Sequence, residues 1–247
     1  MLYLLCLLTL VLRYQAVLLC LAKVSQSNTS SPTLCTMSSW VVVGISGVTN
    51  GGKSTLAQQL HSRLPCHTKV ISQDDYFFPT DSPHHVPCPG GLPHHNWDTI
   101  SALDMNTMLR DVTDIVNSRP DHTKQSSDGG AVTHVWNATD LSPVLLMDGF
   151  ILYDHPGILE LCDLRYFLTL SREECWERRT IRVYDPPDVP GYFEACVWPM
   201  YEEHLARVKE RVPQVTFLDG LLDNYPLVLQ QVTEFSRLKG KARGTQG

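Results

Sequence analysis

Residues 47–54 have the residue types and spacing of a phosphate-binding loop. They read GVTNGGKS and fit the pattern G-x-x-x-x-G-K-[ST]. In this motif the glycines let backbone N–H groups turn toward phosphate oxygens, Lys53 brings a positive charge to the β- and γ-phosphates, and Ser54 offers a hydroxyl to Mg²⁺. A β-branched apolar run precedes the motif and a segment with helical spacing follows it, as the motif requires. We therefore predict binding of ATP or GTP with Mg²⁺; a glycine-rich turn without a ligand is the alternative.

The kind of nucleotide-binding protein depends on the rest of the chain. No Asn-Lys-x-Asp, which specifies guanine in GTPases, occurs in the sequence, and the chain is short for a motor or AAA ATPase. A small-molecule kinase is therefore favoured. The residues predicted to contact the nucleotide in the loop are Gly47, Val48, Thr49, Asn50, Gly51, Gly52, Lys53, Ser54 and Thr55.

Acidic residues follow two apolar runs that are expected to be strands. Asp74 and Asp75 come after residues 69–72, and Asp148 comes after residues 144–147. The carboxyl ends of parallel strands face the crevice in which ligands bind. Asp74 is predicted to accept the proton of an attacking hydroxyl, and Asp148 to reach Mg²⁺ directly or through water. The alternatives are that Asp74 and Asp75 cap the following turn and that Asp148 belongs to a simple Asp-Gly turn.

Three arginines gather near the end of a predicted helix over residues 171–183. Arg178 and Arg182 are four residues apart and are expected on one face of this helix, with Arg179 beside them. Arginine offers planar donors to the charge on a transferring phosphoryl group. With the prolines of residues 186–190, these residues are predicted to form a lid; a solvated basic helix end is the alternative.

Strands and helices alternate along the chain. We predict strands at residues 40–45, 69–72, 144–147, 165–170 and 215–218, and helices at residues 54–64, 99–116, 171–183, 197–212 and 225–238. Asp98 is the expected N-cap of the helix over residues 99–116. The alternation predicts an α/β fold, a P-loop NTPase-type parallel sheet with helices on both faces.

Two segments interrupt this pattern and are predicted to be flexible loops. Residues 79–95 are rich in proline, and residues 120–140 are polar with Gly and Ser. The first loop contains His84, His85, His94 and His95 with Cys88 between them. Their spacing matches no known metal-ligand pattern, so a polar loop is favoured over a metal site.

Composition sets limits on the partners and the compartment. The 247 residues are 43% hydrophobic and 19% charged, as in a globular chain, and the net charge of -6 argues against a nucleic-acid partner. None of the eight cysteines forms a Cys-x-x-Cys pair, which favours reduced thiols in a cytoplasmic protein.

The first residues of the chain differ from the rest. Residues 1–22 are rich in Leu with Arg13 as their one charge, and their length permits a membrane helix. Arg13 near the centre weakens that interpretation. We expect residues 1–36 to be a leader without a catalytic role and residues 37–247 to be the kinase domain. Membrane contact would then occur only if residues 1–22 are retained, and a membrane or secretory segment is the alternative.

Several segments together resemble nicotinamide riboside kinases, which belong with the uridine kinase-like P-loop enzymes. They are residues 44–54, 71–77, 178–187, 191–193 and 197–201, of which RVYDPPD and VWPMY are more specific than the phosphate loop. The resemblance implies phosphorylation of the 5′-hydroxyl of nicotinamide riboside, a small-molecule nucleoside, to the mononucleotide that feeds NAD synthesis. It implies ATP and Mg²⁺ as cofactors and nicotinic acid riboside as a second substrate.

The resemblance also assigns roles to individual residues. Asp74, Lys53 and Arg182 would be catalytic, with Asp74 the proton acceptor, and Ser54, Asp74 and Asp148 would bind the metal. The ATP site would add Arg178, Arg182, Val183 and Tyr184. The riboside would contact Asp74, Asp75, Tyr76, Phe77, Trp97, Asp98, Arg179, Tyr184 and Asp185. Aromatic faces such as Trp97 and Tyr184 suit the cationic pyridinium of the riboside.

The sequence departs from the family pattern in three places. Asp148 stands where the family usually has Glu, residues 79–95 are richer in His and Pro than expected, and the likeness weakens past Gly220. Two rival functions therefore stay open: another nucleoside kinase of this fold, such as a uridine kinase, and a non-catalytic adaptor that keeps the loop for structure only.

Overall fold

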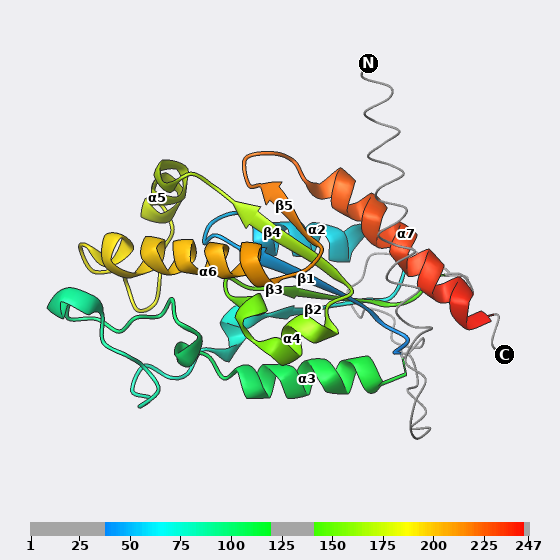
Figure 1. The fold of residues 1–247 in the computed structure, drawn as a ribbon, viewed down its shortest axis with the longest axis horizontal. Coiled ribbons are helices and arrows are strands. Elements are labelled where there is room, and N and C mark those ends of the chain that lie inside the picture. The colour runs from blue at the N-terminus through cyan, green and yellow to red at the C-terminus, as the bar shows by residue number, and fades with distance from the viewer. Residues whose placement is uncertain (1–37, 120–140, 245–247) are drawn as a thin grey trace, which may run out of the picture. The chain divides into compact units, whose positions relative to one another are not determined.

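Five parallel strands form the centre of the computed structural model, which describes residues 38–119 and 141–244 (Figure 1). The strands are β1 (Val41–Gly47), β2 (Thr68–Ser72), β3 (Val144–Asp148), β4 (Leu164–Thr169) and β5 (Val215–Asp219). Their order in the sheet is β2-β3-β1-β4-β5. All four pairings are parallel, which confirms the predicted α/β fold class. The predicted leader and the predicted loop at residues 120–140 lie outside the described residues.

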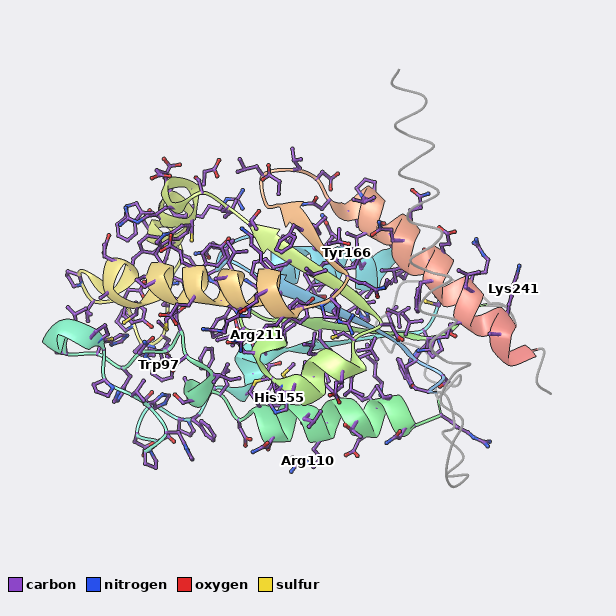
Figure 2. All side chains as sticks on the ribbon, in the orientation of Figure 1. Trp97, Arg110, His155, Tyr166, Arg211 and Lys241 are labelled. Carbon is purple, nitrogen blue, oxygen red and sulfur yellow. The ribbon has the colours of Figure 1, made fainter. Side chains whose placement is uncertain are left out.

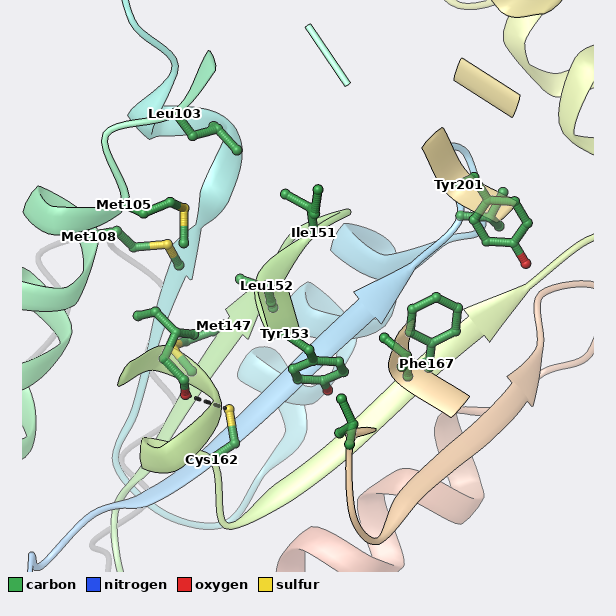
Figure 3. Packing of buried hydrophobic residues seen from close by; sticks show 14 of the residues in the cluster. Leu103, Met105, Met108, Met147, Ile151, Leu152, Tyr153, Cys162, Phe167 and Tyr201 are labelled. Carbon is green, nitrogen blue, oxygen red and sulfur yellow. Dashed lines mark hydrogen bonds between the residues drawn. The ribbon is translucent and has the colours of Figure 1, made fainter. Parts of the chain in front are cut away.

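Helices cover both faces of the sheet. Figure 1 shows α2 (Lys53–Arg63) and α7 (Tyr225–Gly244) on one face, with α3 (Met105–Asn117), α4 (Pro156–Leu161) and α6 (Trp198–Arg211) on the other. A hydrophobic core lies on each face, because successive side chains of a strand point to opposite faces. On β4, Tyr166 packs in the first core, with α2 and α7, and Phe167 packs in the second core, with α3 and α6. In the second core, Met105 and Met108 of α3 lie toward Met147 of β3 (Figure 3).

The two central strands explain the position of the site. Every residue of β1 and of β3 is buried, because each strand has neighbours on both sides and helices on both faces. Both strands end at the same edge of the sheet, where Ile45 of β1 pairs with Asp148 of β3. The phosphate-binding loop and the acid after the apolar run therefore meet at this edge.

The helix that carries the arginines is shorter than predicted. It is α5 (Arg172–Thr180), and it begins with the capping box that joins Ser171 and Glu174. Because the helix ends at Thr180, Arg182 lies beyond it, and the prediction that Arg178 and Arg182 share one helical face was wrong. The chain leaves the helix ahead of Pro186 and Pro187, which favour extended backbone before them.

Asp98 is not a helix cap. A short 3-10 turn (Ile100–Ala102) and an extended Leu103 come first, and α3 then begins after Asp104, whose carboxylate accepts from Thr107 N–H at 3.0 Å. The cap prediction at Asp98 was wrong because Asp104 takes that role, which leaves the Asp98 carboxylate for other contacts.

The remaining predicted elements agree with the structure to within about three residues, apart from the end of α7. Helix α7 extends to Gly244, and a π-helical turn (Phe193–Val197) precedes α6. Short helix α4 and the 3-10 helix η4 (Leu152–Asp154) were not predicted. Within residues 38–119 and 141–244, no helix combines the length and the apolar character needed to cross a membrane.

Candidate active site

The phosphate-binding loop has the backbone conformation that its glycines predict. Gly47 has a φ of 126° and Gly52 a φ of 91°, which side-chain-bearing residues rarely adopt. A side chain at Gly47 would collide with the backbone of Leu168, whereas the space in front of Gly52 is open. The loop is closed by a hydrogen bond of 3.2 Å from Gly51 N–H to the carbonyl oxygen of Val48. The loop therefore leaves room for a ligand at the first turn of α2, where backbone N–H groups are unpaired.

Lys53 folds back over this loop. Its side chain is 9% exposed, and its ammonium donates to the carbonyl oxygen of Val48 at 2.7 Å. Burial lowers the pKa of Lys53 to about 8, although the charges of Asp74 and Asp148 partly offset this effect. A phosphate in the loop would raise the pKa of Lys53 again by supplying negative partners in a site of low dielectric.

Ser54 and Asp148 connect the loop to the next strand. Ser54 Oγ donates to Asp148 Oδ2 at 2.6 Å, and the Asp148 residue is 3% exposed. Burial raises the pKa of Asp148, the Ser54 hydrogen bond and Lys53 oppose the rise, and Asp74 adds to it. Since Ser72 of β2 pairs with Asp148 of β3, Asp74 follows two residues beyond that pair. The ends of two neighbouring strands thus bring both predicted acids beside the loop.

These side chains offer the donor atoms that Mg²⁺ requires. Ser54 supplies a hydroxyl, and Asp148 and exposed Asp74 supply carboxylates, which are hard oxygen ligands. In the part of the chain that the structure describes, no three His, Cys, Asp or Glu side chains form a metal cluster. Mg²⁺ at nucleotide sites takes one or two protein carboxylates, waters and phosphate oxygens. The residues therefore fit the predicted ion.

Three residues of the predicted lid converge on Asn50 in the loop. Arg182 donates to Asn50 Oδ1 at 3.3 Å, the Tyr184 hydroxyl is 2.9 Å from Asn50 Nδ2, and Arg178 donates to the Asn50 carbonyl oxygen at 3.0 Å. Arg178 also donates to the carbonyl oxygen of Gly220 at 3.2 Å, so it links the loop to the end of β5. Arg178 therefore binds backbone atoms in this structure, while Arg182 stays exposed beside the loop.

Arg179 is the most buried arginine of this group. It is 6% exposed and forms a bidentate ion pair with Asp188, at 2.6 Å and 2.9 Å. Its guanidinium lies 4.2 Å above the Tyr184 ring, and the guanidinium of Arg182 lies 5.2 Å from the same ring. The Tyr184 ring predicted to face a cationic pyridinium thus contacts two cations of its own chain. A cavity of about 280 Å³ adjoins these three side chains.

Asp98 and Trp97 are connected through Tyr192. The Tyr192 hydroxyl donates to Asp98 Oδ2 at 2.7 Å and accepts from the Trp97 backbone N–H at 2.9 Å. Burial raises the pKa of Asp98, which Arg179 and Tyr192 partly offset. Trp97 packs edge-on against Phe77, with ring centroids 5.7 Å apart. Figure 2 places Trp97 at the opposite end of the described region from Lys241 on α7.

The proline-rich loop contributes aromatic contacts to the same region. His85 is 8% exposed and its ring centroid lies 4.2 Å from that of Trp97, while His95 stacks on His85 at 5.1 Å. His85 Nε2 is 2.9 Å from the carbonyl oxygen of Pro79. His85 and His95 therefore pack against the predicted riboside residue Trp97, while most other residues of the loop are exposed.

Some predicted residues are not brought into this group. Val183 is 93% exposed, and Thr55, Asp75 and Asp185 are exposed as well. The Tyr76 hydroxyl donates to Asp111 of α3 at 3.2 Å, so it points toward that helix. A contact of these residues with a ligand remains a prediction.

Three residues that the sequence analysis did not select support the site. Tyr192 donates to Asp98, and Asp188 pairs with Arg179. Tyr192 lies in a segment that carries the family resemblance and Asp188 directly follows one, so the resemblance could have identified both residues. Buried Gln73 accepts from the Ile151 N–H at 3.0 Å and thereby joins the end of β2 to the end of β3. A lone glutamine in a single sequence carries no signal for such a role.

Known kinases resemble this chain in sequence. The chain is 38% identical over 189 residues to nicotinamide riboside kinase 1 of Homo sapiens, covering 76% of this chain and 88% of that protein. It is 38% identical over 185 residues to nicotinamide riboside kinase 2 of Mus musculus, covering 73% and 88%. A uridine kinase of Chlamydia pneumoniae is 25% identical over 175 residues, covering 67% and 76%.

Solved structures are more distant. A gluconokinase from Sinorhizobium meliloti aligns with a TM-score of 0.43 at 14% identity, covering 83% of this chain and 94% of that one. No protein-family model matches the sequence.

Proposed function

Because this chain belongs to the nicotinamide riboside kinase family, we propose that it transfers the γ-phosphate of ATP to the 5′-hydroxyl of nicotinamide riboside. The product is the mononucleotide that feeds NAD synthesis, and nicotinic acid riboside is the second substrate. The observation that carries the proposal is the meeting of Lys53, Asp74 and Asp148 at one edge of the sheet, where each affects the charge of another. An adaptor that used the loop for structure alone would need none of these charges together.

The phosphates occupy the loop beneath Lys53. Backbone N–H groups at the start of α2 and the Lys53 ammonium hold the β- and γ-phosphates, and Arg182 neutralises charge on the transferring group. Arg178, through Asn50 and Gly220, keeps the loop in place. When bound, Mg²⁺ would supply positive charge to the phosphates, and Ser54 and Asp148 would hold it.

Asp74 accepts the proton of the attacking hydroxyl. It is exposed just beyond the end of β2, where an acceptor nucleoside can reach it. General-base catalysis of this kind contributes about 10²- to 10⁴-fold to a rate. Because phosphoryl transfer depends mainly on positioning and charge, the loop and Asp74 together account for the chemistry.

The riboside lies toward Trp97, Asp98 and Tyr184. The aromatic faces contact the pyridinium, and the Asp98 carboxylate, already held by Tyr192, accepts hydrogen bonds from the ribose hydroxyls. A cationic base suits this site because Asp98 and Asp188, which both raise the pKa of Arg179, bring negative charge to it.

We further propose that residues 37–247 are the catalytic domain and that the enzyme acts in the cytoplasm. Residues 1–36 are then dispensable for turnover. Full-length protein and residues 37–247 give equal kcat and KM values if this is correct. A shortened protein that folds but has lost activity contradicts it.

The experiment that tests the activity measures phosphorylation by the full-length protein, with ATP and Mg²⁺, of nicotinamide riboside and of uridine in parallel. A higher kcat/KM for nicotinamide riboside is expected. Preference for uridine keeps the mechanism but overturns the substrate. Binding of ATP without turnover of either nucleoside favours the adaptor.

A further inference from the structure

A row of polar side chains runs through the core directly behind the phosphate-binding loop. Ser46 of β1 and His204 of α6 are 0% and 2% exposed, and Ser46 Oγ lies 3.5 Å from His204 Nε2. On its other side, His204 Nδ1 lies 2.8 Å from Asp154 Oδ1. Asp154 Oδ2 accepts from Arg207, one turn further along α6, at 2.6 Å. None of these four residues has a part in the chemistry described above.

The charge of Asp154 fixes the direction of the hydrogen bonds. Burial alone would raise the pKa of Asp154, but hydrogen bonds from His204 and Arg207 outweigh burial and lower it. An ionised carboxylate can only accept, so His204 Nδ1 carries the hydrogen that Asp154 receives. In the neutral ring, Nε2 then faces the Ser46 hydroxyl with its lone pair.

Asp154 stands on an element that is fixed to the sheet. It ends the short helix η4 (Leu152–Asp154), and the preceding Tyr153 lies over β1 (Figure 3). The Tyr153 hydroxyl is 2.7 Å from the carbonyl oxygen of Gly44 and 2.9 Å from that of Tyr166. Because η4 is held by two strands, it gives His204 a rigid partner, and α6 is tied to the sheet through this imidazole.

The other end of the row reaches the loop itself. Ser46 directly precedes Gly47, the residue with a φ of 126° at which the chain turns from β1 into the loop. A cavity of about 20 Å³ adjoins His204, and its walls include Gly47, Thr49 and Asp98. This volume admits one water molecule beside the imidazole.

We propose that His204 is a positioning residue for the phosphate-binding loop. Asp154 and Arg207 orient the imidazole, and the imidazole holds Ser46 and thus the turn at Gly47 in the conformation that accepts phosphate. The inference rests on the proposed use of ATP, but it does not depend on which nucleoside is the acceptor. Loss of the polar contact leaves a buried hydroxyl without a partner and frees the turn, so ATP binding weakens while the acceptor site is spared.

The test measures the Kd for ATP with Mg²⁺ by titration calorimetry on the full-length protein without a nucleoside. His204→Phe keeps the ring volume but removes both nitrogen atoms, and it should raise the Kd for ATP about tenfold. His204→Gln keeps a polar group of similar reach and should restore most of the affinity. Ser46→Ala should weaken binding by several-fold on its own and add little in the His204→Phe background, because the two residues share one contact.

Controls separate positioning from packing. Glu203→Gln removes only the exposed partner of Arg207, 3.4 Å away, and should leave the Kd unchanged. Melting temperatures are measured for every variant. If His204→Phe and Ser46→Ala lower the melting temperature but bind ATP as the wild type does, the proposal is wrong. If His204→Phe does not fold, Ser46→Ala alone decides, and wild-type affinity in that variant overturns the proposal.

The same data distinguish this inference from the proposed function. A wild-type protein that binds ATP but phosphorylates no riboside contradicts the function and leaves the His204 comparison intact. A wild-type protein that binds no ATP contradicts both. In the active enzyme, a rise in KM for ATP with little change in KM for the nucleoside supports the positioning role.

Discussion

Ser54 of the phosphate-binding loop and Asp148 at the end of β3 are joined by a hydrogen bond of 2.6 Å. This contact brings a hydroxyl and a nearly buried carboxylate to one point at the edge of the sheet. Both are ligands suited to Mg²⁺. The contact is therefore the part of the site whose chemistry can be tested most directly.

Replacement of Asp148 should act through the metal. Asp148→Asn keeps the shape but removes the charge, and it should lower kcat about 10- to 100-fold and raise the Mg²⁺ concentration needed for half-maximal rate. Asp148→Glu restores the residue that the family resemblance leads us to expect and should retain more activity. Rates measured over a Mg²⁺ titration check this. Equal Mg²⁺ requirements in wild type and Asp148→Asn would show that Asp148 does not serve the metal.

Asp74 should be required for chemistry rather than for nucleotide binding. Asp74→Ala removes the proton acceptor, so kcat should fall by about 10²- to 10⁴-fold, while the Kd for ATP changes little. Single-turnover rates and calorimetric ATP titration measure the two effects separately. Asp75→Asn is the matched control, since Asp75 is the neighbouring exposed acid and should retain far more activity. Near-wild-type turnover by Asp74→Ala would refute the assignment.

Lys53 should make ATP binding depend on pH. Burial lowers its pKa to about 8, with Asp74 and Asp148 partly offsetting the shift. The protonated form binds phosphate, so as pH rises through about 8 the free enzyme loses this charge and ATP affinity falls. Calorimetric Kd values for ATP at about pH 7 and about pH 9 should differ in the wild type and stay nearly constant in Lys53→Arg, because arginine remains charged. An identical pH dependence in both proteins would assign the titration to another group.

The sequence predicted the sheet and the residues around the phosphates. Continuous apolar runs identify β1 and β3 because strands buried on both faces have no polar positions, and the loop motif fixes the strand before it and the helix after it. Once β1 and β3 are parallel neighbours, Lys53, Ser54 and Asp148 must lie together. These contacts therefore follow from the apolar runs, the loop motif and the parallel pairing of neighbouring strands.

The lid region was less predictable for a physical reason. At and beyond the end of α5, Tyr184 contacts Asn50 and Arg179 pairs with Asp188, and these partners come from distant or irregular segments that leave no periodic pattern. The same is true of Asp98, whose partner Tyr192 is 94 residues further along the chain. Cap and helix-face rules describe one element at a time, so they fail where a side chain bonds to another part of the fold.

The Arg179–Asp188 ion pair should stabilise both the fold and the riboside site. Arg179 is 6% exposed, so removing its partner charge leaves a buried guanidinium without its bidentate acceptor. Asp188→Asn should lower the free energy of unfolding by about 2 kcal/mol, since the pair is a charged hydrogen bond and Asp188 is partly exposed. Chemical denaturation measures this change.

The same substitution should affect one substrate more than the other. Arg179 lies 4.2 Å above Tyr184, so once Asp188 no longer holds it, the aromatic face loses its fixed position and the KM for nicotinamide riboside should rise several-fold. The loop contacts of Arg178 and Lys53 remain, so the KM for ATP should change little. Glu177→Gln, at an exposed position of α5, is the matched control and should leave both KM values unchanged. A loss of stability in Asp188→Asn with an unchanged KM for the riboside would limit the ion pair to a structural role and separate Tyr184 from substrate binding.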